Sequence, residues 1–314
     1  MLQDRIGAHG TSKKCNRISA KYLTCLFTFC VVSLGATIKL KAQDEDITRR
    51  LWDTAFINPS VKKASPRKPA KRSYRVATPN VPTDSVNGET VVGVTLWRLR
   101  RAASTDPGER LIVHEDANAE WLPERISANA KLEKGDRLRI SVEVARTGYL
   151  YVVDREQYAD GSFSEPYLIF PTTRTLGGNN QVSVGKLIEL PARDDRPPYF
   201  TVKRSRADQV AEVLSVLVTP SPLAEIQITG QAQKLSAAEM SEWEKWGAQV
   251  GLLELEGGAG KPWTREEKEA GTGVAGTLKA EAPAPQALYY RSNMKSSDPI
   301  LVKVRLRYAS SANR

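Results

Sequence analysis

Apolar and polar residues alternate without interruption from Arg137 to Val144, and this pattern constrains the fold of the chain more than any other feature of its sequence. The apolar positions are Leu138, Ile140, Val142 and Val144, and the polar positions are Arg137, Arg139, Ser141 and Glu143. Successive side chains of a β-strand point to opposite faces, so a period of two residues is typical of a strand with one face in a core and the other in solvent. We therefore predict a half-buried antiparallel strand, entered through a turn at residues 134–136.

Further apolar runs bounded by turn residues predict a chain made mostly of short strands. These runs lie at residues 91–99, 111–113, 149–153, 167–170, 182–190, 200–202, 213–218 and 302–308. The first run has apolar residues at both odd and even positions, as expected of a strand buried on two faces. We predict a mainly β domain over residues 89–309, folded as an antiparallel β-sandwich that is immunoglobulin-like in general architecture.

Two short helices are predicted to form a small insertion at residues 235–270, before the last strands. Ser236 with Glu239, and Thr264 with Glu267, have the spacing of capping boxes, which satisfy free N–H groups at a helix start. Residues 271–286, rich in Gly, Ala and Pro, are predicted to form a loop, and residues 310–314 a disordered tail.

The N-terminal segment has the order of a secretory signal. Basic residues precede an uncharged apolar stretch at residues 23–34, and Ala42, or less favourably Ala36, suits cleavage. We predict a signal peptide over residues 1–42 and an exported protein, periplasmic or extracellular. Retention of the segment as a membrane anchor is the alternative, because residues 22–38 approach the length of a spanning helix.

The net charge of +10 belongs to the first 75 residues, because residues 76–314 together carry −1. We predict that residues 43–88 form a disordered, basic, Pro-rich linker. The linker is a solubilising tether or, alternatively, contacts an anionic lipid or wall polymer. Its basic side chains include Lys62, Lys63, Arg67, Lys68, Lys71 and Arg72. Nucleic acid is not expected as a partner, because the leader directs the linker away from it.

The chain beyond the leader has few of the side chains that cysteine, histidine or metal chemistry would need. All three cysteines lie in the leader, and His114 is the only histidine beyond it. We therefore predict no catalytic residue, metal ligand or cofactor site. The glycine pattern at residues 271–276 matches a dinucleotide-binding motif, but no strand precedes it. Asp154, Glu156 and Asp160 crowd a hairpin, where polar turn chemistry explains them.

Two sets of side chains remain as candidates. Paired carboxylates can hydrolyse glycosides without histidine or metal. The chain offers Glu189, Asp194, Asp195 and Glu212 among many others. The candidate ligand-binding residues are Trp243, Trp246 and Trp263, because exposed indole rings can stack on sugars. The helical spacing of Trp243 and Trp246 favours packing in a core instead.

Residues 148–191 carry an ordered set of strand and turn motifs. They are Gly148-Tyr149-Leu150-Tyr151-Val152-Val153-Asp154-Arg155, Gly161, Tyr167-Leu168-Ile169-Phe170-Pro171, Asn179-Asn180 and Gly185-Lys186-Leu187-Ile188-Glu189-Leu190-Pro191. Through these motifs, residues 132–222 resemble the domain of unknown function 4384 family. The resemblance implies an accessory role in the bacterial envelope, and it carries over no catalytic residue. Gly148 is expected to permit a backbone conformation that strains other residues, and Gly161 to close a hairpin.

These observations lead to two functional hypotheses. The first is an exported, non-catalytic β-sandwich module that binds a protein partner or a wall polymer of the cell envelope. The second is an envelope hydrolase that acts on glycans through carboxylates. The lack of cysteine and near lack of histidine beyond the leader favour the first hypothesis.

Overall fold

The computed structural model describes residues 90–127, 129–254, 259–271, 278, 283–291, 295 and 297–309. The predicted signal peptide, the linker with its basic side chains and the C-terminal tail lie outside these residues, as does most of the predicted loop at residues 271–286. Those assignments stay predictions.

One antiparallel sheet has eight strands. They are β1 (Thr90–Arg101), β2 (Leu111–Val113), β3 (Ala119–Arg125), β4 (Arg137–Val144), β8 (Leu187–Leu190), β9 (Phe200–Thr201), β12 (Gly251–Glu254) and β13 (Ala287–Arg291). The central strand β1 pairs with β4 on one side, and with β13 and β3 on the other. The strands β8 and β9 extend the sheet beyond β4, while β12 and β2 lie outside β13 and β3.

The second antiparallel sheet has six strands. They are β5 (Gly148–Tyr158), β6 (Tyr167–Phe170), β7 (Gln181–Val182), β10 (Gln209–Thr219), β11 (Gln233–Lys234) and β14 (Ile300–Arg307). The spatial order is β11, β6, β5, β10 and β14, with β7 paired to the start of β5.

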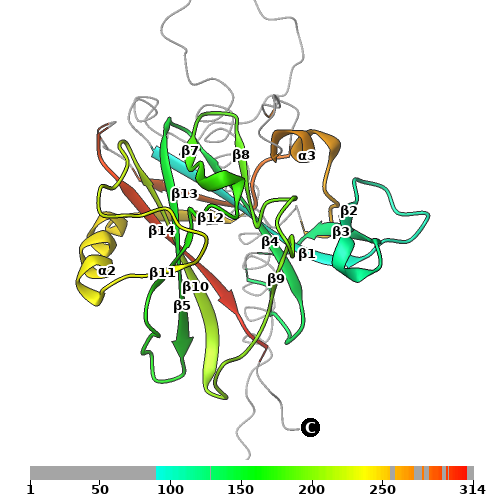
Figure 1. The fold of residues 1–314 in the computed structure, drawn as a ribbon, viewed down its shortest axis with the longest axis horizontal. Coiled ribbons are helices and arrows are strands. Elements are labelled where there is room, and N and C mark those ends of the chain that lie inside the picture. The colour runs from blue at the N-terminus through cyan, green and yellow to red at the C-terminus, as the bar shows by residue number, and fades with distance from the viewer. Residues whose placement is uncertain are drawn as a thin grey trace, which may run out of the picture. The chain divides into compact units, whose positions relative to one another are not determined.

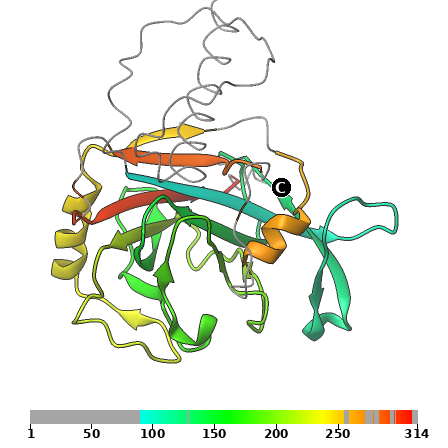
Figure 2. The same ribbon diagram turned by 90° about the horizontal axis from the view of Figure 1, so that it is seen from above.

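The two sheets pack face to face over one apolar core (Figures 1 and 2). Val94 and Ile140 of the eight-stranded sheet belong to the same buried cluster as Val152, Val216 and Val304 of the six-stranded sheet. The prediction of a mainly β fold built from antiparallel strands is therefore confirmed. The immunoglobulin-like architecture stays a prediction.

Two α-helices cover the outer faces of the sheets. They are α2 (Ala237–Glu244), on the six-stranded sheet, and α3 (Arg265–Gly271), on the eight-stranded sheet. Single turns of 3-10 helix occur at η2 (His114–Asp116), η3 (Leu176–Gly178) and η4 (Lys245–Gly247). Among the described residues, no helix combines the length and the apolar composition needed to cross a membrane.

Both predicted capping boxes are confirmed. The backbone N–H of Glu239 donates to Ser236 Oγ at 3.1 Å, and that of Glu267 donates to Thr264 Oγ1 at 3.2 Å. The reciprocal bonds to the two glutamate carboxylates are also present. The insertion is nevertheless not purely helical, because β12 lies between the two helices and joins the edge of the eight-stranded sheet.

The prediction that β4 is half-buried is wrong, because both of its faces are covered. The apolar residues face the core between the sheets, as expected. On the opposite face Arg139, Ser141 and Glu143 are also buried. This face lies beneath α3 and Trp263, where Arg139 is paired with Glu189, whereas burial raises the pKa of the Glu143 carboxyl well above its usual value. An alternating pattern shows which residues share a face, but not whether a distant segment covers that face.

The predicted strand at residues 182–190 is also wrong, because it consists of two strands in different sheets. A turn closed by the Lys186 N–H bond to the Ser183 carbonyl separates β7 from β8. The first pairs with β5 and the second with β4. Four further strands, β3, β11, β12 and β13, were not predicted; β3 contains Pro123, which interrupts the usual strand signal.

Candidate binding cleft

The loop between β8 and β9 (residues 191–199) is held in a fixed conformation by its own polar contacts. Asp195 Oδ2 accepts hydrogen bonds from Thr175 Oγ1 at 2.6 Å and from the Ala192 N–H at 2.9 Å. The Arg196 carbonyl accepts a further bond from Arg174 at 3.2 Å. The loop therefore forms a rigid wall between two cavities. We refer to the two cavities together as the cleft.

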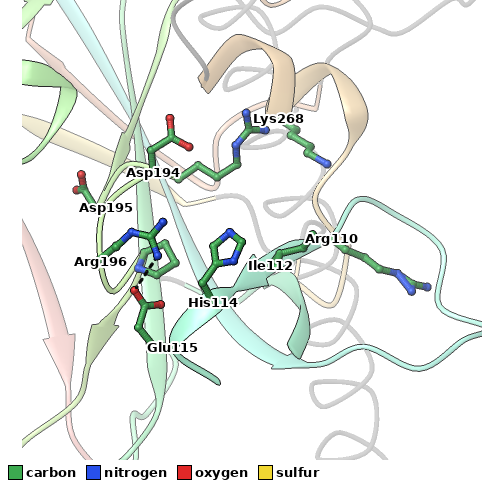
Figure 3. Close-up of a pocket in the computed structure, with 10 residues that line it drawn as sticks. Arg110, Ile112, His114, Glu115, Asp194, Asp195, Arg196 and Lys268 are labelled. Carbon is green, nitrogen blue, oxygen red and sulfur yellow. Dashed lines mark ion pairs between the residues drawn. The ribbon is translucent and has the colours of Figure 1, made fainter. Parts of the chain in front are cut away.

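The first cavity of the cleft has a volume of about 440 Å³ and lies between the loop, β2 and α3. Figure 3 shows His114 and Glu115, just after β2, on one side, with Arg196 of the loop opposite and Lys268 of α3 above. Its lining residues are Arg110, Ile112, His114, Glu115, Arg193, Asp194, Asp195, Arg196, Pro198 and Lys268. This cavity is thus lined mainly by charged side chains.

The second cavity has a volume of about 600 Å³ and lies on the other side of the loop, between β6 and β9. It shares Asp194, Asp195 and Arg196 with the first cavity. It adds two exposed cations, Arg174 and Lys203. The aromatic residues Tyr199 and Phe200 also line it, and Phe200 is 36% exposed.

The cations of the cleft differ in how they are paired. Arg110 and Lys268 bind Glu120 and Glu109 at 2.8 and 2.7 Å, so their charge is largely compensated by acids that line neither cavity. Arg196 and Glu115 are 3.6 Å apart and both are exposed, which makes a weak pair.

Three other cations, Arg174, Arg193 and Lys203, have no carboxylate within ion-pair distance among the described residues. The acids that line the cleft are Glu115, Asp194 and Asp195, and the hydrogen bonds that Asp195 accepts come from neutral donors and leave its charge in place. The four cations Arg174, Arg193, Arg196 and Lys203 outnumber these three acids by one, so the cleft carries a small net positive charge.

A third, smaller cavity of about 220 Å³ opens beside the second and shares Ile169, Phe200 and Thr201 with it. Its walls are mostly apolar, but Asp154 of β5 and Glu212 of β10 lie together in it. Glu212 Oε1 accepts hydrogen bonds from Tyr308 Oη at 2.9 Å and Gln209 Nε2 at 3.0 Å. Asp154 Oδ1 and Glu212 Oε2 are buried and have no hydrogen-bond partner among the described residues.

Burial raises the pKa of Asp154 to about 8, and the neighbouring Glu212 carboxylate adds to this effect. Burial also raises the pKa of Glu212, although the Tyr308 hydroxyl stabilises its charged form. At neutral pH the Asp154 carboxyl group therefore retains its proton. Two like charges this close in an apolar cavity would be unfavourable.

Asp154→Asn is expected to reduce the pH dependence of stability. From about pH 4 to about pH 8 the folded state retains a proton that the unfolded chain releases, so the free energy of unfolding falls as pH rises. An amide cannot ionise, and the variant should be more stable than the parent by about 1–3 kcal/mol near pH 8. Urea unfolding followed by circular dichroism at about pH 5 and about pH 8 measures this change.

Asp160→Asn is the matched control, because hydrogen bonds from Ser162 lower the pKa of this exposed carboxyl. Its substitution should leave the decline between the two pH values unchanged. An Asp154→Asn variant with the full parental decline would show that Asp154 ionises normally in the folded protein.

The three candidate tryptophans do not line a common groove. Trp243 and Trp246 stack with ring centroids 6.4 Å apart, and Trp243, in α2, packs against the six-stranded sheet with an exposure of 3%. Trp263 lies on the opposite sheet beside Arg139 and is 1% exposed. In this structure only Trp246 retains partial exposure, so the indole rings of the other two are not accessible for stacking on a ligand.

The four named carboxylates lie in different environments. Glu189 is buried in an ion pair with Arg139, Asp195 fixes the loop, and Asp194 is exposed in the cleft. Glu212 belongs to the carboxyl pair. The predicted sites did not include Arg174, Arg193, Arg196 and Lys203. No local pattern singles out these residues, since they come together only through the fold.

Within the described part of the chain, no group of three or more His, Cys, Asp and Glu side chains is arranged to hold a metal ion. In the hairpin after β5, Asp160 Oδ1 accepts bonds from the Ser162 N–H and hydroxyl at 2.9 and 2.6 Å. This is the polar turn chemistry expected of Asp160. The same explanation is wrong for Asp154, which lies within β5 and is buried beside Glu212.

Comparisons with protein-family models, with curated proteins and with solved structures found no match for this chain. The resemblance to the domain of unknown function 4384 family therefore rests on the motifs quoted above and stays a prediction. A function must be argued from the cleft itself.

Proposed function

We propose that this protein is an exported, non-catalytic β-sandwich module that binds a protein partner or a wall polymer of the bacterial envelope. The observation that carries the proposal is the cleft beside the β8–β9 loop. Two cavities of about 440 and 600 Å³ share one rigid wall and are open at the surface. Such a paired cavity can accommodate an extended ligand that passes over the loop.

The chemistry of the cleft favours binding over catalysis. The only imidazole among the described lining residues, that of His114, is hydrogen bonded to Asn118 at 2.9 Å and not to a hydroxyl that it could activate. Hydrogen bonds within the protein already hold the loop, so its conformation does not depend on contacts from a ligand. A preformed surface of this kind loses little conformational entropy when it binds.

The proposal is tested by sedimentation of the full exported chain with purified wall material and by capture of envelope proteins on the immobilised chain. We expect one of these fractions to retain the protein, and an Asp195→Ala variant to bind less because the loop loses its internal acceptor. Folding of the variant is checked by circular dichroism. Absence of retention in both assays would overturn the proposal.

The second candidate function is carboxylate-based hydrolysis of an envelope glycan, and the Asp154 and Glu212 pair is the observation that favours it. Glycosidases use two carboxyl groups on either side of the scissile bond, with space between them for the sugar. Here Asp154, whose pKa is raised to about 8, holds its proton at neutral pH as a general acid does, but its contact with Glu212 leaves no space for a sugar between the two groups, so the binding module is preferred. Release of reducing ends from a glycan panel, abolished by Glu212→Gln, would reverse our preference for the binding module.

A further inference from the structure

We infer that the ligand of the cleft is an anionic glycan, whose sugars bear carboxylate or phosphate groups. This inference rests on the proposed function and specifies the chemistry of its partner. It follows from the charge and the exposed aromatic surface of the two adjoining cavities.

The charge of the cleft selects an anionic ligand. The cations without a carboxylate partner lie on both sides of the loop: Arg193 in the first cavity, Arg174 and Lys203 in the second. Arg196 lies in both, and its weak pair with Glu115 is easily exchanged for a ligand anion. Guanidinium groups form paired hydrogen bonds with carboxylate and phosphate oxygens, so these side chains fit either anion.

The positive charge of the cleft argues against its occupation by the basic linker of the same chain. The residues that precede the folded domain contain a basic run from Lys62 to Arg75, and this run would be repelled by the cations of the cleft. The cleft therefore requires a partner molecule of opposite charge.

The aromatic residues favour a glycan over an acidic peptide. Phe200 is 36% exposed and lines the second cavity next to Tyr199, which stacks under Arg137 at 4.6 Å. An exposed ring with neighbouring cations provides an apolar surface for a sugar ring and charges for its acidic substituent. A peptide made only of acidic residues would use the cations but would leave the aromatic surface unoccupied.

The test compares binding of the full chain to immobilised polymers of defined chemistry. The probes are a polyuronate, a phosphodiester-linked glycan, a neutral glucan, poly-glutamate and double-stranded DNA. The first two distinguish carboxylate from phosphate recognition. We expect both, or one of them, to bind more tightly than the last three, and to weaken as salt rises from about 50 to about 300 mM.

The cleft variant is Arg196→Glu/Lys203→Glu, because both side chains are exposed and neither forms a buried contact. The matched control is Lys134→Glu/Lys186→Glu, which changes the net charge equally at exposed positions that line none of the cavities. The cleft variant should lose affinity for the anionic glycan by about tenfold or more, while the control should change by about twofold or less. Thermal unfolding verifies that both variants fold.

The outcomes separate the two claims. Equal weakening by both variants would assign the binding to overall charge and the basic linker, which overturns the inference. Salt-independent binding of the neutral glucan would leave the proposed function standing and overturn the inference. Tighter binding of poly-glutamate or DNA, lost in the cleft variant, would replace the glycan by that polymer. Failure to bind any probe, together with no retention by wall material or envelope proteins, would overturn both.

Discussion

Replacing Arg139 by Met is expected to destabilise the folded domain by about 3–5 kcal/mol. Arg139 Nη2 donates to Glu189 Oε2 at 2.8 Å, and Nη1 donates to the Pro198 carbonyl at 2.6 Å. The side chains of Arg139 and Glu189 are only 2% and 3% exposed. Without the guanidinium, the Glu189 carboxylate would be buried with no compensating charge in direct contact. Urea unfolding at neutral pH measures the loss.

The double variant Arg139→Met/Glu189→Met separates the loss of a partner from the loss of the pair. Replacement of a buried ion pair by apolar side chains of similar volume is often close to neutral, so we expect most of the stability to return. Arg265→Met is the exposed control, because its pair with Glu269 lies at the surface, and its effect should stay within about 0.5 kcal/mol. A single Arg139→Met variant as stable as the parent would show that the pair contributes nothing.

Because the pKa of Glu189 is shifted, the stability lost in the Arg139→Met variant should also depend on pH. Burial raises this pKa to about 7, although Arg139 opposes the effect. Without Arg139 the carboxyl group should take up a proton more readily, so the deficit of the Arg139→Met variant should be smaller below about pH 6 than above it.

Replacing Gly148 by Ala is expected to destabilise the domain by about 2–3 kcal/mol. A Cβ atom at this position would lie 2.4 Å from the Thr219 carbonyl oxygen, which belongs to the backbone of the paired strand β10. The Thr219 backbone can move only by disturbing the pairing of β5 with β10 at the centre of the six-stranded sheet. Thermal unfolding of the variant should give a clearly lower midpoint.

Gly161→Ala is the matched control, because it tests backbone conformation without crowding. Gly161 has a φ of +86° and no atom within 4 Å of an added Cβ. Its substitution should cost about 1 kcal/mol through strain in the left-handed region. Equal effects at the two glycines would contradict the view that close approach of the strands determines the choice at position 148.

The comparison of these glycines shows what the sequence motif could and could not reveal. Both were expected to serve the backbone, and Gly161 does close a hairpin with a positive φ. Gly148 instead allows close approach to another strand, which is a correction to the expected role. A glycine in a motif indicates that a side chain would be unfavourable at that position. The reason depends on which residues lie next to it in space, and these are known only from the fold.

The strands and the candidate site also differed in how far they could be predicted from the sequence. Capping boxes and most strands could be predicted because their signals lie within a few consecutive residues. The burial of Arg139 depends on α3, which follows far along the chain, and its partner Glu189 comes from β8. The cations of the cleft lie in loops after β6, β8 and β9, so no window of sequence places them together.

The pairing of β1 with β13 has a consequence for the order in which the domain can form. β1 is the first described strand to be synthesised, yet β13, one of the three strands that pair with it, is made only after most of the domain. Likewise, β10 lacks one neighbour until β14 is made. The sandwich therefore cannot close around its core until residues 287–307 have left the ribosome. This late closure suits the proposed export, because the chain stays open until most of the domain has been synthesised.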